Sequence, residues 1–401
     1  MHGAIGLLLL LLPLNVGGCP PDPACPDCTD DGNEFEGLRA LRQSIFELEL
    51  AYRWAPVHYQ VVERSGEFSL NGRSDYLTAV DFDGDWNTLN NWSSLAAGDV
   101  DADLTIEYEH PANAAVYYSV VTTATHWYIV YAFYHPRDWC NGIACRQFGS
   151  DFGNDLHEND LEGFLAIVRR PPVFGDREFG SLQAIITVAH NDFYSFVPAG
   201  TPLTGGEEGL DGIVPTTDFR GREHPCTTQE AKGHGLYSLD VPGFAIQFFL
   251  PVLENGVDGG LFACEEAFGE QGDYVKYVPS GVAQDPDSRQ GWPKRDVGYR
   301  LVPIVDTLWA RRRNPETFRQ PGQCRLRGND GVDDLARAPW CWDDTGGFTT
   351  FTLPDGLPAG TLATDPAWTA SNYFDGFFSL SRTYTHNPYQ SISCERFPDG
   401  C

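Results

Sequence analysis

Residues 126–135 read HWYIVYAFYH, a run of aromatic and β-branched side chains that is typical of a β-strand. Similar short runs recur along the chain between clusters of Gly, Pro, Asp and Asn: LTIEYEH at 104–110, AAVYYSVVT at 114–122, GFLAIVRR at 163–170, LQAIITVAHNDFYSF at 182–196, GFAIQFFL at 243–250 and DYVKYVP at 273–279. Several strands at this spacing predict a mainly β protein, an antiparallel β-sandwich with a few peripheral helices.

Two stretches favour helices instead of strands. Asn33 followed by Glu36 has the spacing of a capping box, and apolar residues then recur every three or four positions until the helix stops before Pro56: Phe35, Leu38, Leu41, Ile45, Leu48 and Tyr52. Residues 304–312, IVDTLWARR, predict a late helix whose basic end suits the negative pole of the helix dipole.

The composition limits the classes of partner. The chain has 401 residues, 42% of them hydrophobic, which is enough for a large core. Its 27 basic and 56 acidic residues give a formal net charge of −29, which argues against nucleic acid or an anionic membrane surface as a partner. An acidic protein of this kind attracts cations.

The N-terminus predicts export. Residues 1–19, MHGAIGLLLLLLPLNVGGC, form an apolar run too short to span a bilayer, followed by VGGC, which resembles a bacterial lipobox with Cys19 as the lipidated residue. An ordinary cleaved signal peptide is the alternative. Residues 20–32 are rich in Pro and Asp and predict a tether, and residues 33–401 a single large domain. The predicted location is the outer membrane or cell surface, with membrane contact through the lipid anchor, and otherwise a secreted protein.

The cysteines agree with an oxidising compartment. Of eleven, ten remain if Cys19 carries lipid, an even number that fits a disulfide-stapled fold. Short separations favour three local pairs, and a fourth is left over: Cys140 with Cys145, Cys324 with Cys341, Cys394 with Cys401, and Cys226 with Cys264. Cys25 and Cys28 have no second pair at metal spacing nearby, so a disulfide or free thiols are favoured over zinc.

The stretch HENDLEG at 157–163 predicts a metal site. If the following residues form a strand, Asp160 and Glu162 project from the same face, and His157 can fold back over it. Two neighbouring carboxylates repel unless a cation or a proton lies between them. A divalent ion such as Mg, Ca or Mn fits these oxygen ligands, with Zn less favoured; acids facing water are the alternative.

A resemblance extends this interpretation. YAFYHPRD at 131–138, followed by the H-x-x-D-x-E arrangement of 157–162, resembles the core of the NPP1-like (Nep1-like) necrosis-inducing proteins and of the broader Vps62-related set. The resemblance covers about residues 115–240. It implies a β-sandwich, a divalent ion held by Asp138, His157, Asp160 and Glu162, and recognition of a glycan or lipid head group by a cytolysin-like module. The family heptapeptide GHRHDWE is LHENDLE here, so the metal site transfers better than toxicity.

Other residues have competing interpretations. Asp81, Asp83 and Asp85 surround Gly84 as at the start of a calcium loop, but a polar Asx-type turn is favoured because the twelfth position is Trp92 instead of Glu. His190 is expected to be structural, whereas His234 in KGHGLYS, similar to a His-Gly element of the family, could support the metal site or act as a general base. Trp340 and Trp342 are expected to pack near a disulfide, with sugar stacking as the alternative.

Three functions are consistent with this sequence. The favoured one is a surface-anchored binding module with a divalent metal. The second is a metal-dependent hydrolase in which His234 or Glu158 moves the proton. The third is an envelope or interaction protein whose metal is structural.

Overall fold

The computed structural model describes twelve segments of the chain, without the side chains of residues 31–39, 157, 392 and 393: residues 31–64, 69–91, 110–139, 157–171, 179–189, 192–206, 209–238, 274–288, 296–319, 324–328, 336–344 and 359–393. The chain divides into two compact units, Met1–Ser44 and Ile45–Cys401. Helix α1, Asp31–Trp54, contributes residues to both units, and all strands lie in the second.

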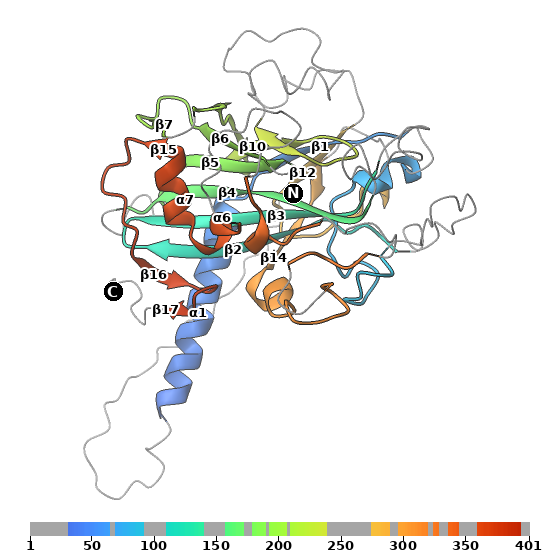
Figure 1. The fold of residues 1–401 in the computed structure, drawn as a ribbon, viewed down its shortest axis with the longest axis horizontal. Helices are drawn as coiled ribbons and strands as arrows, with labels where there is room; N and C mark the ends of the chain where they lie inside the picture. Colours follow the sequence, from blue (N-terminus) through green and yellow to red (C-terminus); the bar gives the residue numbers. More distant parts are fainter. Residues whose placement is uncertain are drawn as a thin grey trace, which may run out of the picture. The chain divides into compact units, whose positions relative to one another are not determined.

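Two mixed sheets form the framework of the second unit (Figure 1). The six-stranded sheet has the order β11-β10-β1-β12-β13, with β9 added beside β10. Its strands are β1 Val57–Val61, β9 Thr216–Phe219, β10 Arg222–Gln229, β11 Leu236–Ser238, β12 Tyr274–Val278 and β13 Asp296–Gly298.

The nine-stranded sheet has the order β17-β16-β2-β3-β4-β5-β6-β8, with β14 added beside β2. Its strands are β2 Ala115–Thr123, β3 His126–Asp138, β4 His157–Arg169, β5 Ser181–Ala189, β6 Asp192–Val197, β8 Gly212–Ile213, β14 Arg300–Pro303, β16 Tyr384–Asn387 and β17 Ile392–Ser393. A separate pair joins β7 Thr204–Gly205 to β15 Phe374–Asp375.

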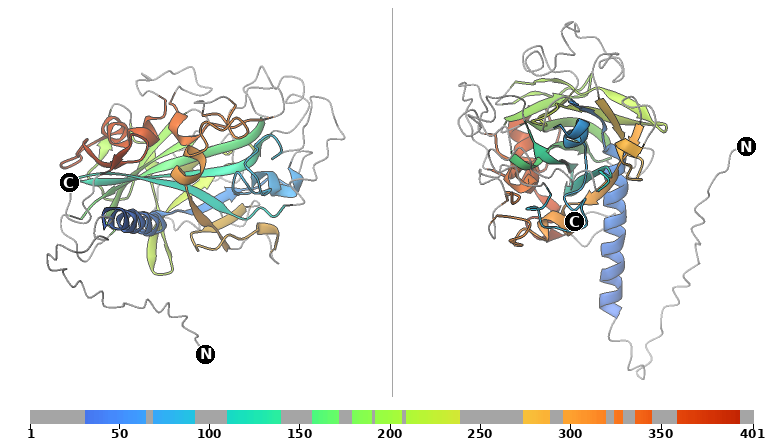
Figure 2. Two further views of the ribbon diagram at one scale, coloured as in Figure 1. Left: turned by 90° about the horizontal axis from the view of Figure 1, so that it is seen from below. Right: turned by 90° about the vertical axis from the view of Figure 1, so that its right-hand side faces the viewer.

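The nine-stranded sheet has a hydrophobic core on each face. The inner core lies between the two sheets and includes Phe164, Ile129, Tyr277 and Val275, together with Trp54 of α1. The outer core lies on the opposite face and is covered by the C-terminal part of the chain, including helices α6 Thr361–Thr364 and α7 Pro366–Tyr373 (Figure 2). Because both faces of the sheet are covered, β2, residues 127–134 of β3 and residues 163–168 of β4 are largely apolar instead of alternating.

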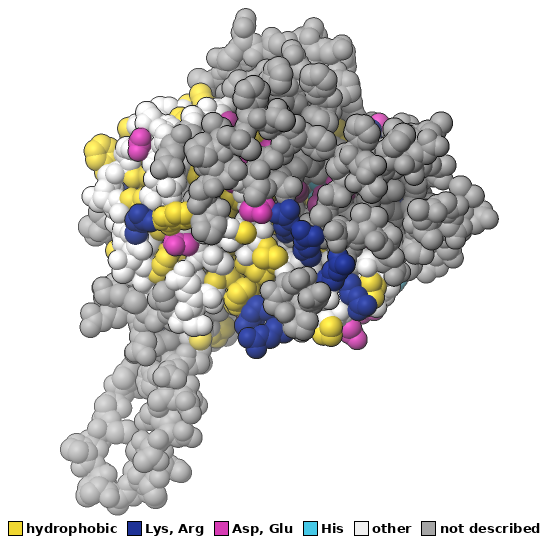
Figure 3. All heavy atoms as spheres, viewed as in Figure 1, with side chains coloured by type: hydrophobic (Ala, Val, Ile, Leu, Met, Phe, Trp, Pro, Cys, Tyr) yellow, Lys and Arg dark blue, Asp and Glu magenta, His cyan; other side chains and the backbone are white. Residues whose placement is uncertain are grey.

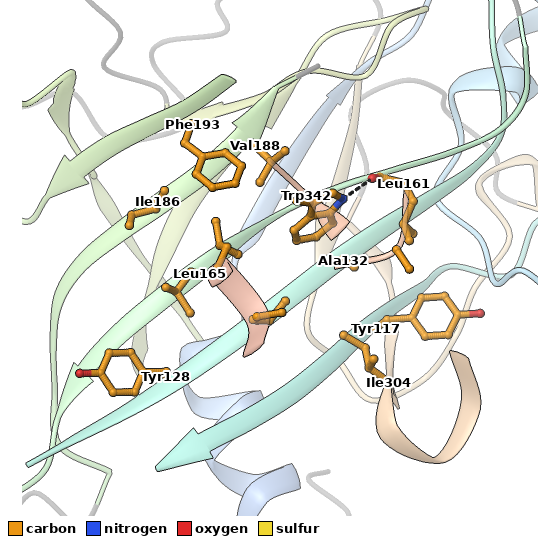
Figure 4. Packing of buried hydrophobic residues seen from close by; sticks show 14 of the residues in the cluster. Tyr117, Tyr128, Ala132, Leu161, Leu165, Ile186, Val188, Phe193, Ile304 and Trp342 are labelled. Atoms are coloured by element: carbon orange, nitrogen blue, oxygen red, sulfur yellow. Dashed lines mark hydrogen bonds between the residues drawn. The ribbon is translucent and has the colours of Figure 1, made fainter. Parts of the chain in front are cut away.

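The outer core shows how a distant segment covers the sheet. Trp342 packs beside Leu161 and Ala132, and its indole Nε1 donates a hydrogen bond of 3.0 Å to the Leu161 carbonyl (Figure 4). A Cβ added at Gly163 would lie 2.5 Å from the Trp342 ring and 2.1 Å from the Tyr131 carbonyl oxygen. Gly163 therefore allows this close approach. Trp342 packs in the core, which is the interpretation that the sequence favoured over sugar stacking.

The predicted mainly β class is confirmed, and the differences lie in its details. The pairings β1–β10, β12–β13, β14–β2 and β6–β8 are parallel, so the sheets are mixed instead of purely antiparallel. Residues 304–312 form the π-helix η4, Val305–Trp309, followed by turns. The predicted strands at 104–110 and 243–250 lie outside the described residues except for His110.

Helix α1 departs from the predicted pattern. It begins at Asp31, before the expected cap at Asn33. Ile45, expected on the buried face, is 49% exposed, whereas Leu50, Ala51 and Trp54 are buried. The last turns of α1 therefore pack against the core through Leu50, Ala51 and Trp54, a face that the spacing of apolar residues alone did not identify. No helix in the described part of the chain is both long and apolar enough to cross a bilayer.

The predicted Cys324–Cys341 disulfide is confirmed. Cys226 is buried and disulfide-bonded, and its expected partner Cys264 lies outside the described residues. The remaining cysteines also lie outside them: Cys19, Cys25, Cys28, Cys140, Cys145, Cys394 and Cys401.

Candidate functional site

Charged side chains are buried where β3 ends and β4 begins. We call this region, residues 135–138 and 157–162, the charged end. The pairing places His135 opposite Asp160, Arg137 opposite Glu158 and Asp138 opposite His157. Asp138, Glu158, Asp160 and Glu162 are at most 7% exposed, so the alternative of acids facing water does not describe them.

Asn159 fixes the backbone at this end. Its φ of 61° lies in the left-handed region, which asparagine tolerates better than most residues. The Tyr134 hydroxyl donates a 2.7 Å hydrogen bond to the Asn159 side-chain oxygen, and the Asn159 amide donates to the carbonyls of Thr88 and Arg327. These bonds hold the start of β4 against two loops that are distant in sequence.

His234 contacts the charged end from the opposite sheet. It follows β10, in a loop where Lys232 and His234 both have positive φ values. Its Nδ1 lies 2.9 Å from Asp160 Oδ2, and its Nε2 lies 3.1 Å from Asp75 Oδ1. Burial lowers the pKa of His234, but the hydrogen bonds and charges of Asp160 and Asp75 outweigh it and raise the pKa to about 10. An imidazolium therefore lies between two carboxylates.

Asp75 joins three segments around this imidazolium. The side chain is fully buried at the end of the 3₁₀ helix η1, Leu70–Asp75. Its Oδ1 accepts hydrogen bonds from Trp139 Nε1 at 2.8 Å and the Lys232 backbone amide at 2.9 Å, besides the contact with His234. Its Oδ2 accepts one from the Glu63 amide at 2.8 Å. Sequence reasoning missed Asp75 because it belongs to no motif and precedes Asp160 by 85 residues.

His135 has the opposite charge state. Its ring stacks on His234 with 3.8 Å between centroids and 5° between planes. Burial, and then the charge of His234, lower the pKa of His135 well below its ordinary value. Its Nε2 lies 3.0 Å from Gln229 Oε1, and the Gln229 amide donates to the His234 carbonyl at 2.6 Å. A neutral imidazole therefore packs directly on a charged one.

Besides Asp160 and Asp75, a second pair of acidic residues, Glu162 and Glu230, acts on Tyr237. Both add to the effect of burial in raising the pKa of Tyr237 well above its ordinary value. A Cβ on Gly235 would lie 3.0 Å from both Glu230 Oε1 and the Tyr237 hydroxyl. The absence of a side chain at Gly235 therefore allows the loop that carries His234 to pass close to these groups.

The structure brings together only some of the predicted site residues. Asp160 and His234 are in direct contact, whereas no three His, Cys, Asp or Glu side chains among the described residues are grouped as metal ligands. The His157 side chain, the fourth predicted ligand, lies outside the described residues, as does His190. The His234 ring places a positive charge directly beside Asp160, one of the predicted ligands.

The predicted calcium loop is a series of Asx turns. Asp83 Oδ1 accepts from the Asp85 amide at 3.2 Å, Asp85 Oδ1 accepts from the Asn87 amide at 2.7 Å, and Asp85 Oδ2 accepts from the Asn90 side chain. The Gly84 amide donates to the Asp81 carbonyl, with a φ of 103° at the glycine. These bonds match the polar turn that the sequence favours.

Comparisons with known proteins give only structural likenesses. No family model and no curated protein sequence matches the chain. Similar solved structures include the non-toxic HaNLP3 protein, at 13% identity over 49% of this chain and 71% of that one, with a TM-score of 0.25. Necrosis and Ethylene inducing Protein 2 from the causal agent of cocoa's Witches Broom disease is 14% identical over 47% of this chain and 66% of that one, with a TM-score of 0.22. The structure of NLPPya in complex with glucosamine is 17% identical over 47% of this chain and 65% of that one, with a TM-score of 0.24. These low TM-scores carry no argument about family or activity.

Proposed function

We propose that the charged end is a divalent-cation-dependent binding site for a glycan or lipid head group. One observation supports this proposal above all. Four acidic side chains of the same strand pair, Asp138, Glu158, Asp160 and Glu162, are buried beside a large apolar core. Burying charge costs stability unless it is compensated, and such a cost is most often tolerated at functional sites.

The chemistry of the donors fits a hard divalent ion. Asp138, Asp160 and Glu162 offer carboxylate oxygens, and His157 is the proposed fourth ligand. Mg, Ca and Mn prefer such oxygen-rich ligands, and Zn less so. A bound ion would attract hydroxyl or anionic oxygens of the ligand.

His234 and Asp75 favour binding over hydrolysis. Both nitrogens of His234 lie within hydrogen-bond distance of a carboxylate, so neither is left to accept a proton from a substrate as a general base. Its role in the proposal is to hold Asp160 in a fixed orientation.

The protein is further proposed to be an exported lipoprotein anchored through Cys19. Labelled palmitate should enter the wild-type protein and not a Cys19→Ala variant. Equal labelling of both would reject lipidation at this residue.

Glycan arrays and liposome-leakage assays, with and without a chelator, test the binding function. The wild type should bind a defined glycan or head group only when a divalent ion is present, and Glu162→Gln should lose this binding. Glu223→Gln, which removes an exposed acid from β10, is the matched control and should behave as the wild type. Chelator-independent binding, or turnover in an esterase, phosphatase and glycosidase panel, would contradict the proposal.

A further inference from the structure

The arginines of this acidic protein are concentrated in one segment. Residues 300–337 contain 8 of the 24 arginines and 5 acidic residues, a formal charge of 8 − 5 = +3. The rest of the chain then carries −29 − 3 = −32. Figure 3 shows basic side chains gathered in a band on one face, where the orange segment runs in Figure 1.

A disulfide holds part of this segment in place. Cys324–Cys341 joins two short stretches, in which Arg325 lies directly opposite Arg337 in an antiparallel bridge. The Leu326 amide donates to the Ala336 carbonyl at 2.9 Å, and the Ala338 amide donates to the Cys324 carbonyl at 2.7 Å. Leu326, Ala336 and Ala338 are buried in the outer core, whereas the alternating arginines are partly exposed: Arg325, Arg327 and Arg337.

This pairing is electrostatically unfavourable for the isolated protein. Like charges directly opposite each other in a β-ladder are destabilising. Arg337 is compensated by an ion pair with Asp343, and Arg327 donates to the Pro315 carbonyl at 3.0 Å. The Arg325 carbonyl accepts from the Arg319 amide at 3.2 Å, and its partly exposed guanidinium has no ion pair with a described residue.

Aromatic rings order two neighbouring arginines. The Arg311 guanidinium lies 3.9 Å from the centre of the Trp86 ring, and that of Arg312 lies 4.2 Å from the Trp309 ring. Trp309 packs on Trp340, next to the disulfide, with 5.0 Å between ring centres. Guanidinium groups held this way lose less side-chain freedom when they bind an anion.

We propose that Arg311, Arg312, Arg325, Arg327 and Arg337, which we call the arginine face, bind the carboxylate or sulfate groups of an anionic polysaccharide. Arginine suits these groups because its planar fork donates two parallel hydrogen bonds. None of the exposed large hydrophobic residues among the described ones, Leu41, Ile45, Ile213, Val282 and Phe378, belongs to this segment, which disfavours membrane insertion.

Biolayer interferometry with immobilised heparin, polygalacturonate and neutral dextran tests the proposal on the full chain. Wild-type protein should bind at least one anionic polymer, not dextran, and less tightly as salt increases. Arg325→Gln/Arg327→Gln should weaken binding by about tenfold or more, since charge-assisted hydrogen bonds are lost. Arg220→Gln/Arg222→Gln removes two exposed arginines at the same spacing on the β9–β10 hairpin and should leave binding within about twofold, in line with small rim-charge effects.

The single variant Arg325→Gln separates a loss of binding from a loss of folding, because it removes a guanidinium that has no ion pair with a described residue. It should leave the melting temperature unchanged while weakening binding. Equal losses in both double variants would overturn the proposal, because the effect would then be one of overall charge. Binding to anionic vesicles but to neither anionic polymer would also overturn it.

Discussion

The pair β3–β4 contains two regions that share one hydrogen-bonded ladder but differ in what they bury. In the apolar half, residues 127–133 and 163–168, Tyr131 stacks on Phe164 with 4.8 Å between ring centres. In the charged end, His135 stacks on the His234 imidazolium, and acids take the place of aliphatic side chains. The same ladder pairs both regions and is interrupted only at Pro136 and Asn159, so the main difference lies in the side chains.

This difference separates a region whose burial stabilises the fold from the proposed binding site. Apolar burial contributes roughly 25 cal/mol per Å² and needs no specific partner. Buried charges need exact partners, and here they find them in Asp75 and His234, which come from loops far away in sequence. The charged end therefore depends on the correct placement of three segments, whereas the apolar half depends mainly on volume.

The largest expected effect comes from the apolar half. Phe164→Ala removes a fully buried ring between Tyr131 and Phe133 and should destabilise the protein by about 4 kcal/mol, through lost burial and a cavity. Urea unfolding measures this change. A loss below about 1 kcal/mol would mean that the sheets repack freely at this point.

A smaller loss is expected at Asp75. Asp75→Asn removes the charge that faces His234 and turns an acceptor into a partial donor, so about 3 kcal/mol should be lost. Asp375→Asn, at an exposed position, is the control and should change stability by less than about 0.5 kcal/mol. Equal stability of the two variants would show that the buried network contributes nothing.

Cation binding should stabilise the charged end and leave the apolar half unaffected. At a free ion concentration about 100-fold above the dissociation constant, the added stability should be about 2.7 kcal/mol. Differential scanning calorimetry should show this gain for the wild type and for an apolar-half variant, Ile167→Val. It should be absent from Asp160→Asn, and its persistence there would remove Asp160 from the site.

The smallest effect concerns pH. His58 lies between the sheets, 4.6 Å from the Phe133 ring and 6.2 Å from that of Tyr277, and its Nδ1 contacts the Thr227 hydroxyl. The titratable groups near it are Tyr277 and neutral His135. Burial lowers the pKa of His58 from 6.5 to about 3.

Below pH 6.5, His58 binds a proton in the unfolded chain but stays neutral in the folded protein. The stability is therefore complete above pH 6.5 and is lost as the pH falls toward 3. Between pH 6.5 and about 5.5 the loss should be about 1 kcal/mol. His58→Gln should reduce the acid dependence by that amount in urea unfolding, and an unchanged slope would contradict this assignment.

The sequence predicted the strands that are rich in β-branched and aromatic residues, and it missed those that are not. β2 to β6 follow from runs such as AAVYYSVVT, whereas β10, REHPCTTQ, contains polar residues and a proline and gives no strand pattern. β10 is nevertheless held between β1 and β11 by the sheet. Tertiary context outweighs local preference there.

The candidate site was predictable only where a motif marks it. Asp160 and His234 stood out by their local patterns, and the Cys324–Cys341 pair by its short separation. Asp75 is surrounded by ordinary turn residues, and only the fold brings it to His234. No local rule relates residues that are 159 positions apart.

Isothermal titration of Ca²⁺ or Mn²⁺ into chelator-treated protein tests the central claim most directly. The wild type and Glu223→Gln should bind one ion per chain, and Glu162→Gln should bind it at least about tenfold more weakly because one carboxylate ligand is lost. Binding of equal strength in all three proteins would place the ion elsewhere. The absence of any binding to the wild type would contradict the cation-dependent site at the charged end.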